Sequence, residues 1–167
     1  MRESNFLIKL GAKRELRLVE PSDEICRSYL EKSENCLKAA KLLLRHDLHE
    51  NSIAMSYYAM YDSLTALLFK IGVKCENHSG SILLLEKLFE RKDLFDAISF
   101  AKKQRIDKQY YIITQNEFGT IKDDTETMIK KAEEFRIQIR IIVEKVSLNE
   151  IAMLREKLKK ILRQRIS

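Results

Sequence analysis

Apolar side chains recur every three or four residues along most of this chain, which is the spacing of one face of an α-helix. In the segment 23–46 the recurring positions are Ile25, Tyr29, Cys36, Leu37, Ala40 and Leu44. Stretches that suit further helices follow at 51–71, 81–91, 94–113, 123–146 and 151–166. The pattern therefore predicts an all-α protein of five or six helices.

Residues that interrupt or cap helices are few and lie between these stretches. Pro21 is the only proline, and Ser22 directly after it can cap the helix that begins at residue 23. Gly72 follows the second stretch, at the place where a left-handed residue ends a helix. Ser147 and Glu150 form an S-x-x-E capping box ahead of the last stretch. These signals set the ends of three of the predicted helices.

The helix predicted at 51–71 carries three tyrosines within five residues. With a rotation of about 100° per residue, Tyr57 and Tyr61 share the apolar face, and Tyr58 lies about 100° away at its edge. We therefore expect Tyr57 and Tyr61 in the core and Tyr58 with its hydroxyl near water. Almost opposite is a row of small residues that would let another helix approach closely: Ser52, Ser56, Ala59, Ser63 and Ala66.

Composition narrows the class of protein. The chain has 167 residues, 45% of them hydrophobic, which suits one domain with a substantial core. We expect an N-terminal extension at 1–20, a helical bundle at 21–146, and a basic amphipathic helix at 147–167 that packs on the bundle or on a partner. No apolar run reaches the roughly 20 residues of a membrane span, and no secretory signal is evident. A cytoplasmic protein with no membrane partner is therefore expected.

Positive charge is concentrated near the two ends of the chain. Residues 1–17 carry five basic and two acidic side chains, and residues 151–167 carry six and one, whereas the residues between them carry 20 and 22. A uniformly basic nucleic-acid binder spreads such side chains across a face of its folded body. Attraction to RNA or to an acidic partner would therefore involve the ends of this chain.

Three parts of the chain form a distinctive combination: YYAMY at 57–61, the glycine-ended LLFKIG at 67–72, and NHS at 77–79, which opens the next helix. Together they resemble the HEPN family of small helical prokaryotic domains. The similarity extends from about residue 20 to residue 111. It implies an up-and-down bundle that is often homodimeric. It also implies a frequent partner, a minimal nucleotidyltransferase, with which such proteins form toxin and antitoxin pairs.

The catalytic signature of the family is incomplete in this chain. Active members are metal-independent ribonucleases that carry an arginine and, after four to six residues, a histidine. Arg105 matches the arginine, but Tyr110, Tyr111 and an isoleucine occupy the three allowed places. A related branch carries an aspartate and then a tyrosine at the fourth and fifth positions after the arginine. Tyr110 fits that tyrosine, whereas a glutamine replaces the acid and the nearest acid is Asp107.

The resemblance thus gives a set of candidate residues. For binding of a nucleotide or phosphate they are Arg105, Asp107, Tyr58 and Tyr110. Tyr110 and Tyr111 are also candidate targets for nucleotide transfer by a partner enzyme. On an ideal helix Arg105 and Tyr110 point about 140° apart, so the two would meet only through the reach of the arginine or across a subunit interface.

Cleavage of RNA by its own 2′-hydroxyl requires a group that moves protons near neutral pH and a cation that stabilises the phosphorane. Tyrosine is a poor base because its ordinary pKa is about 10. His78, at the entrance to a helix, could serve from a different helix than Arg105; the alternative is a histidine that belongs to the cap of that helix and has no chemical role. His46 and His49 form an H-x-x-H pair without further ligands nearby. We expect no metal and no other cofactor.

Two classes of function remain open. In the first, the protein is a non-catalytic module that homodimerises and binds a nucleotidyltransferase and a nucleotide or RNA. In the second, it is a metal-independent ribonuclease with a rearranged site, in which Arg105 holds the phosphate and His78 or Tyr110 moves protons. A missing general acid–base group costs a factor of about 10² to 10⁴ in rate, which favours the first class.

Overall fold

A computed structural model describes residues 2–110 and 118–163, with side chains from residue 5 to 108 and from 121 to 163. These residues form seven helices and one antiparallel pair of short strands. In chain order the elements are α1 (Arg2–Ala12), β1 (Leu16–Leu18), α2 (Asp23–Arg45), α3 (His49–Lys70), β2 (Val73–Cys75), α4 (His78–Lys87), α5 (Lys92–Tyr110), α6 (Phe118–Lys145) and α7 (Leu148–Arg163). The predicted all-α class is confirmed, and the described residues hold one helix more than expected because residues 2–12 form α1.

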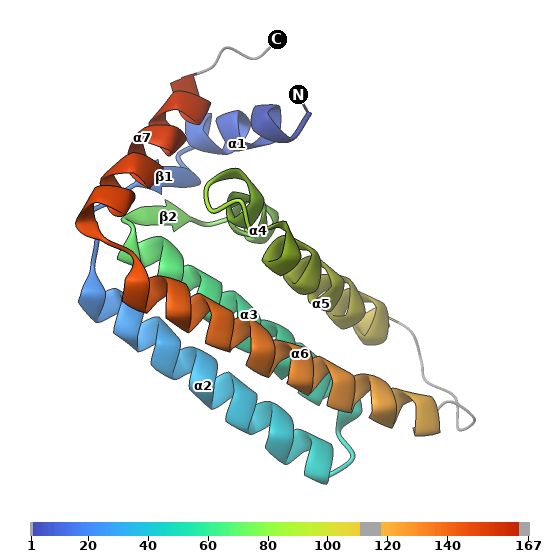
Figure 1. Ribbon diagram of the computed structural model, residues 1–167. Helices are drawn as coiled ribbons and strands as arrows, with labels where there is room; N and C mark the ends of the chain where they lie inside the picture. The colour runs from blue at the N-terminus through green and yellow to red at the C-terminus, as the bar shows by residue number, and fades with distance from the viewer. Residues whose placement is uncertain (1, 111–117, 164–167) are drawn as a thin grey trace.

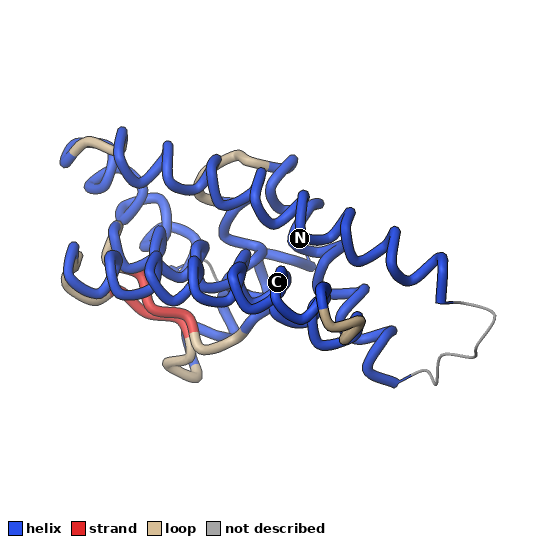
Figure 2. Tube along the Cα trace, turned by 90° about the horizontal axis from the view of Figure 1, so that it is seen from below, coloured by secondary structure: helices blue, strands red, loops and turns tan. Residues whose placement is uncertain are grey.

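The long helices are arranged around α3. Helices α2, α5 and α6 all pack against it, and successive long helices α2, α3, α5 and α6 alternate in direction, as Figure 1 shows. The same rods are seen from below in Figure 2, where the short strand pair lies at one end of the bundle. No helix within the described residues is long and apolar enough to cross a membrane.

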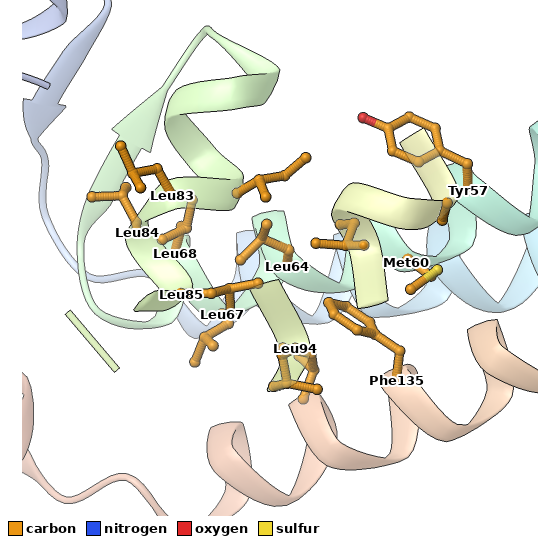
Figure 3. Packing of buried hydrophobic residues seen from close by; sticks show 14 of the residues in the cluster. Tyr57, Met60, Leu64, Leu67, Leu68, Leu83, Leu84, Leu85, Leu94 and Phe135 are labelled. Atoms are coloured by element: carbon orange, nitrogen blue, oxygen red, sulfur yellow. The ribbon is translucent and has the colours of Figure 1, made fainter. Parts of the chain in front are cut away.

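Helix α3 is buried on two sides because of the residues that it carries. The predicted row of small side chains is buried, and two serine hydroxyls form hydrogen bonds between α2 and α3 along this contact. The Ser33 hydroxyl of α2 donates to the carbonyl of Ala59 at 2.6 Å, and the Ser52 hydroxyl donates to the carbonyl of Ala40 at 2.7 Å. On its apolar face, Tyr57 and the leucines that follow it meet α4, α5 and α6 (Figure 3).

The helix ends form at the predicted capping residues. The Ser22 hydroxyl accepts a hydrogen bond from the amide of Ile25 at 3.2 Å. Gly72 has the left-handed φ of 69° that ends α3 and turns the chain into β2. Ser147 and Glu150 make the reciprocal bonds of a capping box before α7. These predictions are confirmed.

The two ends of the chain are brought together. Helices α1 and α7 pack against each other beside the strand pair, in which Leu16 faces Cys75 and Leu18 faces Val73 (Figure 1). Gly11 permits the close approach, since a Cβ at that position would lie 2.8 Å from Leu162. The basic segments at the two ends of the sequence therefore belong to one end of the molecule.

Candidate functional site

Three helices bring a group of aromatic, basic and imidazole side chains together. Helix α3 supplies Tyr57, Tyr58 and Tyr61. Helix α4 begins with His78, and α5 carries Lys102 and Arg105, which are three residues apart and therefore lie on one face of that helix. The contacts between α3, α4 and α5 place these side chains in a single cluster.

Arg105 is held against two tyrosine rings. Its Nη1 donates a hydrogen bond to the Tyr58 hydroxyl at 2.7 Å. The guanidinium carbon lies 5.1 Å from the centre of the Tyr57 ring and 5.4 Å from that of Tyr58, which are cation–π distances. Its Nε is buried and has no hydrogen-bond partner among the described residues. The arginine is therefore fixed by the aromatic rings and retains unused donor capacity.

His78 is held by a phenol and an aromatic ring. Its Nδ1 lies 2.8 Å from the Tyr57 hydroxyl, and its ring stacks on Tyr61 with 3.8 Å between ring centres and 10° between planes. The Asn77 side chain caps α4 by accepting from the amide of Gly80 at 3.0 Å, which fixes the start of this helix. The imidazole is thus held beside the capped start of α4 and is part of the cluster.

The hydrogen bond between Tyr57 and His78 determines where the imidazole carries its proton. Tyr57 is fully buried, and burial raises the pKa of its phenol above the ordinary 10.0, so the hydroxyl stays protonated. Its one hydrogen-bond partner among the described residues is Nδ1 of His78. Since a buried hydroxyl is stabilised by donating to an acceptor, the geometry favours the arrangement in which Tyr57 donates and Nδ1 accepts. In neutral His78 the proton consequently resides on Nε2, which is a donor.

The cluster carries positive charge without a matching carboxylate. Lys102 donates from Nζ to the Ser79 hydroxyl at 2.6 Å. Burial lowers the pKa of Lys102, and the charge of Arg105 lowers it further. Burial also lowers the pKa of His78 below the usual 6.5, with smaller effects in the same direction from Arg105 and Lys102. Within the described side chains no carboxylate forms an ion pair with Lys102 or Arg105, so an anion would relieve the repulsion between them.

Three members of the cluster also line a pocket of about 370 Å³. Tyr58, Tyr61 and His78 form part of its wall, which continues along α2, α3 and the end of β2. Asp62, only 3% exposed, lies in the same pocket and receives a hydrogen bond from Lys32 Nζ at 3.2 Å. The pocket and the basic cluster therefore share Tyr58, Tyr61 and His78.

The structure brings together some of the residues singled out from the sequence. Arg105, His78 and Tyr58 lie in the cluster. Asp107 is on α5 but makes no hydrogen bond or ion pair with a described side chain. The side chain of Tyr110 and the whole of Tyr111 lie outside the described residues.

Sequence reasoning missed Lys102, Asp62, and the hydrogen bond between Tyr57 and His78. The spacing of three between Lys102 and Arg105 on a predicted helix would have indicated a basic pair on one face. Tyr57 was assigned to the core alone, because a helical wheel cannot show what its hydroxyl meets. Asp62 gives no pattern in the sequence, because its burial depends on helix α2.

Comparison with known proteins agrees with the fold. The chain is 28% identical over 120 residues to a candidate toxin of Methanocaldococcus jannaschii. The aligned region covers 70% of this chain and 87% of that protein. It is 26% identical over 127 residues to a UPF0332 protein of Thermotoga maritima. That alignment covers 73% of this chain and 93% of that protein. The HEPN domain model matches residues 26–142, which is more than half of the chain. The resemblance seen in the tyrosine-bearing helix is thus confirmed, and the chain belongs to the HEPN domain family.

Proposed function

We propose that this chain is the HEPN half of a toxin–antitoxin pair and that it binds a phosphate of RNA or of a nucleotide between His78, Lys102 and Arg105 without cleaving it. In this proposal it acts as a homodimer, and a minimal nucleotidyltransferase is its partner. The relative from M. jannaschii, named as a candidate toxin, supports the first part. The family resemblance supports the dimer and the partner.

The observation that carries the proposal is the hydrogen bond from Tyr57 to Nδ1 of His78. Cleavage needs a base with a free lone pair that takes the proton of the 2′-hydroxyl. In the tautomer that Tyr57 imposes, one imidazole nitrogen is occupied as an acceptor and the other carries a proton. His78 is therefore arranged as a hydrogen-bond donor to an anion and lacks a lone pair for proton abstraction.

The rest of the cluster suits a phosphate. Lys102 and Arg105 supply two positive charges whose mutual repulsion an anion would reduce. The N-terminus of α4 adds a favourable dipole beside them. Hydrogen bonds to a charged group such as phosphate each contribute about 1.5–3 kcal/mol, so the three donors together give a site of useful affinity even after the entropic cost of binding.

The test is binding of a short 2′-O-methyl RNA, which presents phosphodiesters and cannot be cleaved. We expect Lys102→Gln and Arg105→Gln each to weaken binding about tenfold or more, measured by fluorescence anisotropy at fixed salt. The matched control is Lys103→Gln, which removes the same charge from an exposed neighbouring position on α5. A Lys103 variant that loses as much affinity as the other two would show general attraction in place of a defined site.

A second candidate function is metal-independent cleavage of RNA, with Arg105 on the phosphate and His78 moving protons. The guanidinium of Arg105 lies over the ring of Tyr57 and His78 is hydrogen-bonded to the hydroxyl of the same residue, which favours their acting on one phosphate. Incubation of unmodified RNA with the protein and a chelator decides between the two functions. Our proposal predicts intact RNA. Products ending in 2′,3′-cyclic phosphate that disappear in His78→Ala would establish the second candidate.

A further inference from the structure

We propose that the pocket beside the basic cluster binds a guanine base and that Asp62 selects it. The inference rests on the proposed function, because it places the base of the ligand whose phosphate lies at His78, Lys102 and Arg105. Its own support comes from the aromatic lining of the pocket, the buried carboxylate in it, and the residues that it shares with the phosphate site.

Two pairs of stacked rings line the pocket and give it flat apolar surfaces. Tyr29 of α2 stacks on Phe69 of α3, with 5.6 Å between ring centres and 11° between planes. Tyr61 stacks on His78 in the same way at 3.8 Å. Aromatic rings are the usual platforms for nucleobases, and the volume of about 370 Å³ is within the range of small-ligand sites.

Asp62 is the polar group that gives the pocket its selectivity. It is only 3% exposed, and its carboxylate accepts from Lys32 Nζ at 3.2 Å and from the Cys36 thiol at 3.6 Å. Each carboxylate oxygen has a second acceptor position. Asp62 lines the pocket, and the acceptor positions that these two donors leave open favour a ligand with N–H donors, since such donors replace lost water.

Guanine is the base that matches a carboxylate. Its Watson–Crick edge carries two adjacent donors, the ring N1–H and the exocyclic amine, which can both bond to one carboxylate. Adenine and cytosine present an amine beside a ring nitrogen whose lone pair would face the carboxylate, and uracil presents one N–H between two carbonyls. An ionised carboxylate only accepts hydrogen bonds, so it attracts the guanine edge and repels the other three.

The phosphate site and the pocket are adjacent. Tyr58 accepts the hydrogen bond of Arg105 and also lines the pocket. His78 likewise belongs to both, with its Nδ1 on Tyr57 and its ring in the pocket wall. A guanine nucleotide, free or within a single RNA strand, could therefore place its base by Asp62 and its phosphate by Arg105.

The test compares GMP with AMP by isothermal titration calorimetry. The intact protein is expected to bind GMP about tenfold or more tightly than AMP, the discrimination typical of two adjacent hydrogen bonds to a base. Asp62→Asn should abolish the preference, because an amide donates as well as accepts and so fits adenine too. Lys32→Gln removes the same ion pair but keeps the carboxylate, so it should retain the preference.

Equal binding of GMP and AMP by the intact protein would overturn the inference, and that result does not depend on any variant folding correctly. An Asp62→Asn protein that keeps the full preference would overturn it as well. The two proposals fail in different ways. If Arg105→Gln leaves GMP affinity unchanged while Asp62→Asn removes the preference, the pocket stands and the phosphate site falls. If Arg105→Gln weakens both nucleotides and neither is preferred, the phosphate site stands and the pocket falls.

The same guanine can come from a free nucleotide or from RNA. Two 2′-O-methyl pentanucleotides that differ only in a central guanine or adenine distinguish these sources. A preference for the guanine strand supports RNA as the ligand. A preference seen with GMP over AMP but not between the two strands supports a free nucleotide.

Discussion

The imidazole of His78 is hydrogen-bonded to a buried phenol and lies in the field of two cations. Its bond to Tyr57 leaves Nε2 as a donor, and Lys102 and Arg105 disfavour a second proton on the ring. A neutral donor beside two cations binds an anion without needing to be charged itself. At the scale of the residue, the proposed phosphate site thus offers a neutral donor beside two cations at neutral pH.

This arrangement predicts a change in the pKa of His78 when Arg105 is replaced. In Arg105→Gln the pKa of His78 should rise toward the ordinary 6.5, because one of the charges that lower it is gone. The pKa is measured by NMR of the imidazole protons during a pH titration. Lys103→Gln serves as the control and should leave it unchanged. Equal shifts in the two variants would mean that net charge, and not the geometry around His78, sets the pKa.

The same shift has a consequence for stability, with a definite sign. Because the folded-state pKa of His78 is depressed, the unfolded chain takes up the proton first as the pH falls. The free energy of unfolding should therefore decrease from about pH 6.5 down to the folded-state pKa, and this decrease should be smaller in Arg105→Gln. Urea denaturation at several pH values measures it.

At the scale of elements, one arginine of helix α7 lies within hydrogen-bond distance of three backbone carbonyls beside the strand pair. Arg155 Nη1 lies 2.7 Å from the carbonyl of Val19, 3.1 Å from that of Ile71 and 2.8 Å from that of Gly72. These carbonyls belong to the segments that flank the strand pair, where the left-handed turn at Gly72 exposes them. Ile151 and Leu158 of α7 are buried nearby. Arg155 therefore joins α7 to the end of α3.

Arg155→Met is expected to lower the free energy of unfolding by about 2 kcal/mol, because the carbonyls lose a charged donor that no water readily replaces. Urea denaturation with a fixed m-value measures the change. Arg163→Met, an exposed position on the same helix, should change stability by less than about 0.5 kcal/mol. A similar loss in both variants would indicate that the charge of α7, and not this contact, matters.

Helices with a long run of regularly spaced apolar residues could be predicted from the sequence. Elements that depend on contacts with residues far along the chain could not. Helices α2 and α3 follow from spacing and caps that lie within each segment. Strand β1 has three residues, too few to show alternation, and it exists because β2 pairs with it from far along the chain. Helix α1 was expected only as part of an extension, because α7, which covers it, comes last in the sequence.

At the scale of the whole molecule, the candidate site depends on folding to bring α3, α4 and α5 together. Arg105 and His78 could be identified as candidates from the sequence. His78 and Tyr110 remained alternatives as the group that moves protons, because a sequence holds no information on distances between helices. The helical pattern predicted Tyr58 at the edge of a core face, and there its hydroxyl accepts a hydrogen bond from Arg105. Basic side chains are concentrated near both ends of the sequence, and the packing of α1 on α7 brings them to one end of the molecule.

The central claim is that Tyr57 fixes His78 as a donor, so that the protein holds a phosphodiester and leaves it intact. The most direct measurement is the tautomer of His78 at neutral pH, from ¹⁵N–¹H correlation spectra of the labelled imidazole. The account predicts a proton on Nε2 and a hydrogen-bonded acceptor at Nδ1. A proton on Nδ1 with a bare Nε2 would contradict it, because His78 would then present a base to the 2′-hydroxyl of RNA.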